Sequence, residues 1–115
     1  MSRLGHNLEN SINVVQKLKQ VPKAGLEFGD FIIATTCNSN YKIRKLENNL
    51  FEVSGGWFDR KGLSPTVLTI RGCTWGGSII KVDIIAACGL CMEFGNNLIT
   101  TPIKKIVIIK FQNMN

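Results

Sequence analysis

The segment that decides the fold class is FIIATTCNSNYKIRKLENNLFEV, residues 31–53. Two polar clusters, Asn38-Ser39-Asn40 and Glu47-Asn48-Asn49, divide it into three short runs that are rich in β-branched and aromatic residues. Asn and Ser favour turns because their side chains bond to nearby backbone groups and tolerate left-handed conformations. The segment therefore predicts three consecutive antiparallel strands, and the second and third form the clearest hairpin of the chain.

The same alternation of apolar runs with turn-forming clusters of Gly, Asn, Asp and Pro continues from about residue 28 to residue 111. This meander predicts a mainly β fold, a small antiparallel β-barrel or roll of six or seven strands. A two-sheet sandwich of the same strands is the alternative. A chain of 115 residues can bury one modest core, so we expect residues 1–115 to form a single domain.

The apolar residues before the meander have the spacing of a helix instead of a strand. Five apolar residues fall three or four positions apart, as on one face of a helix: Leu4, Leu8, Ile12, Val15 and Leu18. Pro22 disfavours helix at the residue before it and so sets an end point. We therefore expect one N-terminal amphipathic helix over about residues 7–20, packed on the sheet.

The chain is basic, with 14 Lys and Arg against 8 Asp and Glu and a net charge of +6. A cationic surface suits nucleic acid, an anionic membrane or an acidic protein, and it also favours solubility. The apolar runs are too short to cross a bilayer, and the first ten residues lack the apolar core of a signal peptide. We expect a cytoplasmic protein without a membrane partner.

Four cysteines occur in the chain: Cys37, Cys73, Cys88 and Cys91. The last two form a C-x-x-C motif, but no second pair and no His pair stands at zinc-binding spacing from it. A redox C-x-x-C needs a strand-to-helix context that the surrounding strand-like residues do not offer. We expect unliganded thiols and no cofactor, while a four-thiolate metal site stays open if folding brings all four cysteines together.

No catalytic constellation is visible. His6 is the only histidine, and any Ser-His or Cys-His system would have to use it. The carboxylates form no close pair in the sequence, which leaves Asp59, Asp83 and Glu93 as groups that folding could assemble for acid–base chemistry. We expect that the protein is not an enzyme.

Two glycine dipeptides, Gly55-Gly56 and Gly76-Gly77, interrupt the meander. Neither belongs to a phosphate-binding loop, because the Lys and Ser or Thr of such loops are missing. Glycines that interrupt strands usually mark bulges, sharp corners or a close approach of two backbones, and we expect that here.

One set of residues suggests nucleic-acid binding. Small barrels bind single strands by stacking bases on aromatic rings while cations follow the phosphates. Candidates for this role cluster around one loop and on the preceding hairpin: Trp57, Phe58, Arg60, Lys61 and Arg71, with Tyr41, Lys42 and Arg44. The alternative interpretation is that the aromatic residues fill the core and the cations form a solvated rim.

Four short segments carry a resemblance: Thr36-Cys37-Asn38-Ser39-Asn40-Tyr41, Val53-Ser54-Gly55-Gly56, Ile70-Arg71-Gly72 and Thr100-Thr101-Pro102-Ile103. Together they resemble a group of short uncharacterised bacterial and phage β-rich proteins with the pattern T-R-N-S-x-Y … V-x-G-G … T-S-x-V. Cys37 stands where that pattern has Arg, and Thr101 stands where it has Ser. The resemblance implies a β-rich fold and no particular activity.

The functional interpretation that follows is a non-enzymatic interaction module. It would bind a protein partner or a second copy of itself through a sheet edge or through the apolar face of the helix. A single-stranded nucleic-acid-binding β-barrel is the alternative.

Overall fold

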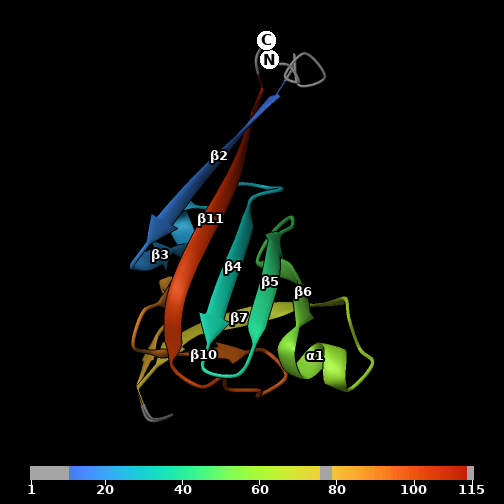
Figure 1. Cartoon of the computed structure of the whole chain (residues 1–115), viewed down its shortest axis with the longest axis vertical. Helices are drawn as coiled ribbons and strands as arrows, with labels where there is room; N and C mark the ends of the chain where they lie inside the picture. The colour runs from blue at the N-terminus through green and yellow to red at the C-terminus, as the bar shows by residue number, and fades with distance from the viewer. Residues whose placement is uncertain (1–10, 76–78, 114–115) are drawn as a thin grey trace.

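The structure is a computed structural model, and it describes residues 11–75 and 79–113 (Figure 1). Strands dominate these residues, with one five-residue α-helix and one 3-10 turn among them. In chain order the elements are β2 (Ser11–Leu18), β3 (Gln20–Pro22), η2 (Lys23–Gly25), β4 (Phe31–Thr36), β5 (Asn40–Lys45), β6 (Leu50–Gly55), α1 (Gly56–Arg60), β7 (Thr66–Thr74), β8 (Ile80–Lys81), β9 (Ile84–Ala87), β10 (Cys91–Phe94) and β11 (Ile103–Asn113).

Seven antiparallel strands form a strongly curled half-barrel, in the order β10-β7-β6-β5-β4-β11-β2. The short strand β8 pairs with β7 outside this path. The hairpins β4–β5 and β5–β6 lie where the quoted segment predicts them, and their turns fall at residues 37–39 and 46–49. The mainly β prediction is therefore confirmed, in a half-barrel arrangement.

The predicted N-terminal helix over residues 7–20 is wrong for the part of it that the structure describes. Residues 11–18 form β2, which pairs with β11 over eight residue pairs, and residues 7–10 lie outside the described residues. Ile12, Val14 and Val15 are β-branched, which favours a strand, and β11 offers a long edge of unsatisfied backbone groups. Pairing with β11 thus outweighs the helical spacing, which within this segment rests only on Ile12, Val15 and Leu18.

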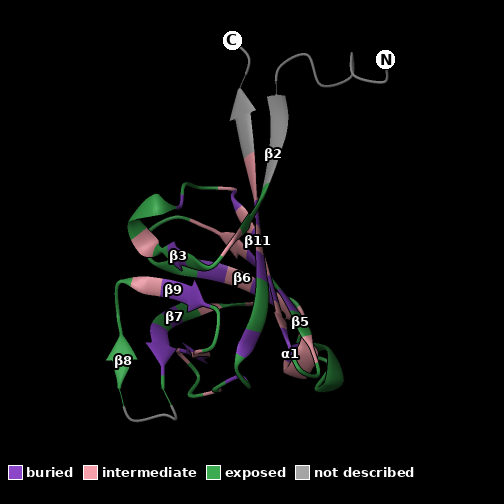
Figure 2. Cartoon of the chain, turned by 60° about the vertical axis from the view of Figure 1, so that its left-hand side comes forward, coloured by how far each residue is buried: buried purple, intermediate pink, exposed green. Residues whose placement is uncertain are grey.

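The inner face of the half-barrel carries the core, as the burial pattern along each strand shows (Figure 2). In β4 and in residues 40–43 of β5 every second residue is buried, which is the period of a strand with one face inward. The largest fully buried side chains include Phe58, Phe94, Ile32, Ile43 and Ile106.

The small sheet β3–β9 packs against β7, β10 and β11. The C-x-x-C segment that follows β9 links this sheet to the main one. The Cys88 N–H donates to the Lys19 carbonyl at 2.8 Å, and the Gly89 N–H donates to the Ile103 carbonyl at 2.8 Å. In return the Ile103 N–H donates to the Leu90 carbonyl at 2.9 Å. The motif that suggested metal or redox chemistry therefore supplies backbone bonds between two sheets.

The Gly55-Gly56 pair turns β6 into α1 at a close approach of two backbones, as expected from the sequence. Gly55 has φ 92° and Gly56 has φ 47°, a region that L residues rarely adopt. A Cβ on Gly55 would overlap the Asn40 carbonyl oxygen, and a Cβ on Gly56 would overlap the Tyr41 ring. The second dipeptide, Gly76-Gly77, lies outside the described residues.

We predict that Gly55→Ala lowers the free energy of unfolding by at least about 3 kcal/mol, because it combines a Gly-only backbone conformation with a backbone clash. Gly62→Ala is the matched control, since Gly62 also has a positive φ of 69° but nothing lies within 4 Å of its added Cβ. The control should cost only about 1 kcal/mol. Urea unfolding measures both, and equal losses would contradict the close approach at Gly55.

Candidate functional site

The aromatic residues proposed to stack on bases form part of the core. Phe58 is fully buried and Tyr41 is 4% exposed. The Phe58 ring meets Tyr41, Trp57 and Phe94 edge to face, with centroids 6.3, 5.2 and 5.3 Å apart. Trp57 is half-buried against this cluster. Phe58 and Tyr41 therefore anchor α1 to the sheet and offer no free face to a base.

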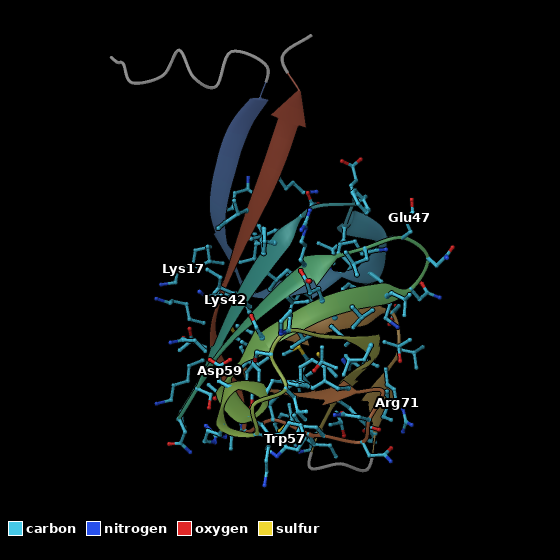
Figure 3. All side chains as sticks on the ribbon, turned by 90° about the vertical axis from the view of Figure 1, so that its right-hand side faces the viewer. Lys17, Lys42, Glu47, Trp57, Asp59 and Arg71 are labelled. Carbon is cyan, nitrogen blue, oxygen red and sulfur yellow. The ribbon has the colours of Figure 1, made fainter. Side chains whose placement is uncertain are left out.

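Three of the predicted cations lie near α1. Arg60 Nη1 donates to Ser39 Oγ at 3.2 Å, which ties the helix to the β4–β5 turn. Lys61 is exposed directly after the helix. Lys42 on β5 lies near Asp59, and Figure 3 shows the two side by side at one side of the molecule.

The other two cations lie elsewhere and already have partners. Arg44 lies 4.0 Å from the Glu52 carboxylate and stands over the Phe31 ring. Arg71 sits in a β-bulge opposite β10, and its Nη1 is 3.0 Å from Glu93 Oε2. Arg71 lies at the opposite side of the molecule from Lys42 (Figure 3). The structure thus brings only part of the predicted set together.

A polar cleft lies between the β4–β5 turn and α1. It has a volume of about 580 Å³, and a second hollow of about 210 Å³ shares four of its lining residues: Thr36, Asn38, Ser39 and Arg60. Three of the segments that carry the resemblance meet here, because Gly56 lines the first hollow and Thr100 and Thr101 line the second.

The carboxylate of Asp59, which lines this cleft, is held in a structural role. The Asp59 carboxylate accepts hydrogen bonds from the Ser64 hydroxyl and from the Gly55 N–H, the latter at 3.0 Å. The Ser64 hydroxyl, the Gly55 N–H and the Lys42 charge hold the pKa of Asp59 below its usual value. Asp59 is therefore a carboxylate near neutral pH, and its bonds fix the corner before α1.

The three candidate acid–base carboxyls belong to different surroundings. Asp59 is bound to Ser64 and Gly55, whereas Glu93 is 9% exposed at its side chain and pairs with Arg71. Asp83 is exposed between β8 and β9. Their separate surroundings give no acid–base pair among these three residues.

The four cysteines differ in how far they are buried. Cys73 is fully buried, and burial raises the pKa of its thiol to about 11. Cys91 is half-buried, and Cys37 and Cys88 are exposed. Across residues 11–75 and 79–113, no three Cys, His, Asp or Glu side chains are grouped so as to hold a metal ion. His6 lies outside the described residues.

The outer edge of β2 is the feature that the sequence analysis missed. The Thr36 N–H donates to the Ser39 carbonyl, and the carbonyl of Asp30, directly before β4, accepts from the Lys45 N–H. The backbone groups of even-numbered residues of β4 therefore point toward β5. Because strand backbones alternate, Ile33 and Thr35 bond to β11, and Ile106 and Ile108 of β11 bond to β2.

The partners of those β11 residues are Leu18 and Gln16. Asn13, Val15 and Lys17 therefore point their backbone N–H and C=O groups away from β11. Lys19, the next in this series, accepts the Cys88 N–H, which agrees with the alternation. Within the described residues no strand pairs with the outer edge of β2 between Ser11 and Lys17.

The same edge continues past the body of the sheet. The β4 ladder on β11 ends at Ile109, whereas the β2 ladder runs on to Asn113. Residues 110–113 of β11 and 11–14 of β2 therefore form a two-stranded ribbon, which Figure 1 shows projecting from the half-barrel. A lone two-stranded ribbon is marginal in water, so a further strand would stabilise it.

A groove lies at the inner end of this edge, with a volume of about 520 Å³. Its lining combines four lysines with one apolar residue and one thiol: Lys17, Lys19, Lys104, Lys105, Leu18 and Cys88. The two pairs of lysines are far apart in the sequence, and the pairing of β2 with β11 brings them together. The net charge of +6 indicated a cationic surface, but nothing in the sequence showed that these two pairs of lysines meet.

Comparison of the chain with protein families, with curated proteins and with solved structures finds no match. Among the residues described, no helix has the length and apolar character needed to cross a bilayer. Function is therefore inferred from the geometry alone.

We predict a specific alkaline instability from Cys73. The folded thiol stays protonated up to about pH 11, whereas the unfolded thiol ionises above about pH 9, so ionisation favours unfolding across that interval. Between these values wild type should lose roughly 2–3 kcal/mol relative to Cys73→Ala. Cys88→Ala, which removes an exposed thiol, should keep the wild-type pH dependence. Denaturant titrations between pH 8 and pH 11 test this, and a Cys73→Ala curve parallel to wild type would refute it.

Proposed function

We propose that the protein is a non-enzymatic interaction module that binds another polypeptide as an added strand on the outer edge of β2. The observation that carries this is the row of outward backbone groups at Asn13, Val15 and Lys17. Such an edge is a ready template for an extended chain, whose own backbone completes the ladder.

The chain already adds one of its own strands, β9, along the continuation of this edge. β3 continues the line of β2, and its outer side pairs with β9 through Gln20–Ala87 and Val21–Ala86. This pairing ends where Cys88 bonds to Lys19 and the chain turns away at Gly89. A partner strand would extend the line of β9 along the rest of the edge.

The charges favour a different protein over a second copy. β2 and the next residue carry Lys17 and Lys19 and no acidic residue, and the whole chain has a net charge of +6. Two copies that paired through this edge would each bring a net charge of +6 to the contact, and like net charges oppose association. The proposed occupant is therefore a strand of another polypeptide.

Binding can be tested with a capped seven-residue peptide, Thr-Val-Gln-Val-Thr-Val-Gln, and isotope-labelled protein. We predict that the peptide slows hydrogen exchange at the amides of Asn13, Val15 and Lys17, because these groups gain backbone partners. Val15→Pro should weaken binding at least about tenfold, since proline removes an outward donor from an edge strand without breaking the β11 ladder.

Val15→Ala is the matched control, because it shortens the same side chain and keeps the N–H. It should bind the peptide nearly as tightly as wild type. Equal binding by the Pro and Ala variants, or no change in exchange along β2, would refute strand addition at this edge.

Light scattering gives a second prediction, on the identity of the occupant. The protein alone should keep a monomer mass as its concentration rises, because the like charges of two edges oppose pairing. A dimer that Val15→Pro dissociates would show that a second copy fills the edge.

A further inference from the structure

The groove at the inner end of the β2 edge has an unbalanced charge. Within residues 11–75 and 79–113, ion pairs join Arg44 to Glu52, Arg71 to Glu93 and Lys110 to Asp30, and none of them includes a lysine of the groove. The groove is lined by no carboxylate. Four lysines thus line a volume of about 520 Å³, and the ion pairs among the described residues include none of them.

A β-bulge in β11 exposes two of these lysines side by side in the sequence. The register of β11 against β4 shifts between Ile103 and Lys105, so Lys104 is an extra residue in the strand. The bulge lets both Lys104 and Lys105 be exposed, although neighbours in a regular strand point to opposite faces. On β2, Lys17 stands opposite Val107, on the outer face of the sheet.

The groove also lies in line with the free edge. Cys88 caps the edge at Lys19, and Cys88 and Lys19 both line the groove. A strand that pairs with Asn13, Val15 and Lys17 would therefore end in the groove. We propose that this partner strand is acidic at the end that reaches Cys88, an inference that rests on the proposed function.

The lining favours an acidic peptide over nucleic acid. Single-stranded nucleic acid is held by stacking on aromatic side chains as well as by cations, and none of the described residues that line the groove is aromatic. The edge beside it offers donors and acceptors at the spacing of a strand, which suits a polypeptide backbone. Carboxylates at the end of that strand would meet the lysines at hydrogen-bond range.

The test extends the neutral peptide Thr-Val-Gln-Val-Thr-Val-Gln by Glu-Glu-Glu or by Gln-Gln-Gln, at either end. At low salt, one of the two Glu peptides should bind about tenfold more tightly than its Gln counterpart, since each opposite-charge contact adds a modest gain. The gain should shrink toward unity at about 0.5 M salt, because screening of the charges is then nearly complete. The end that shows the gain gives the direction of the added strand.

The double variant Lys104→Glu/Lys105→Glu should abolish the preference for Glu and leave binding of the Gln peptides within about twofold of wild type. The control Lys61→Glu/Lys81→Glu changes the net charge equally at exposed positions outside the groove, and it should keep most of the preference.

The outcomes separate the two proposals. Failure of every peptide to bind would overturn strand addition and the acidic partner together. Equal binding of Glu and Gln peptides that Val15→Pro abolishes would overturn only the acidic partner. Tight binding of oligothymidylate that needs Lys104 and Lys105 and ignores Val15→Pro would assign the groove to nucleic acid and overturn the acidic strand.

Discussion

The pairing of β11 with strands on both of its edges is the constraint on which the structure depends. β11 joins β4 to β2, and its start at Ile103 bonds to the C-x-x-C segment. Through these bonds the N-terminal strand, the C-terminal strand and residues 88–90 become neighbours. The free edge and the lysine groove both exist because β2 is held beside β11, since neither Lys17 nor Lys19 would otherwise meet Lys104.

The chemistry that the sequence suggested elsewhere is largely used to build the fold. Phe58 and Tyr41 pack in the core, and Asp59 fixes the corner at Gly55. The C-x-x-C segment supplies backbone bonds, and Arg71 neutralises the nearly buried Glu93. Within residues 11–75 and 79–113, the outer edge of β2 has no paired strand and the groove lysines take part in none of the ion pairs, and the proposed strand addition rests on these two features.

The β-rich class and the central hairpins could be predicted because alternation and turn residues are local signals, clear in Tyr41–Leu46 and in Asn38-Ser39-Asn40. The first strand could not. Ile12, Val15 and Leu18 fit a helical stripe better than a strand, in which a spacing of three alternates between faces, and only pairing with the distant β11 overrides that local signal. The same long-range pairing hid the groove, because its lysines lie at opposite ends of the sequence. Trp57 and Phe58 were ambiguous since adjacent aromatic residues do not reveal which one faces inward.

Amide hydrogen exchange along β2 in the free protein distinguishes a strand with one open edge from every other arrangement of residues 11–18. We expect alternation, with slow exchange at Val14, Gln16 and Leu18, which bond to β11, and fast exchange at Asn13, Val15 and Lys17, whose amides face outward. Continuous protection across residues 13–18 would contradict it, because that result means either a helix or an edge that is already covered.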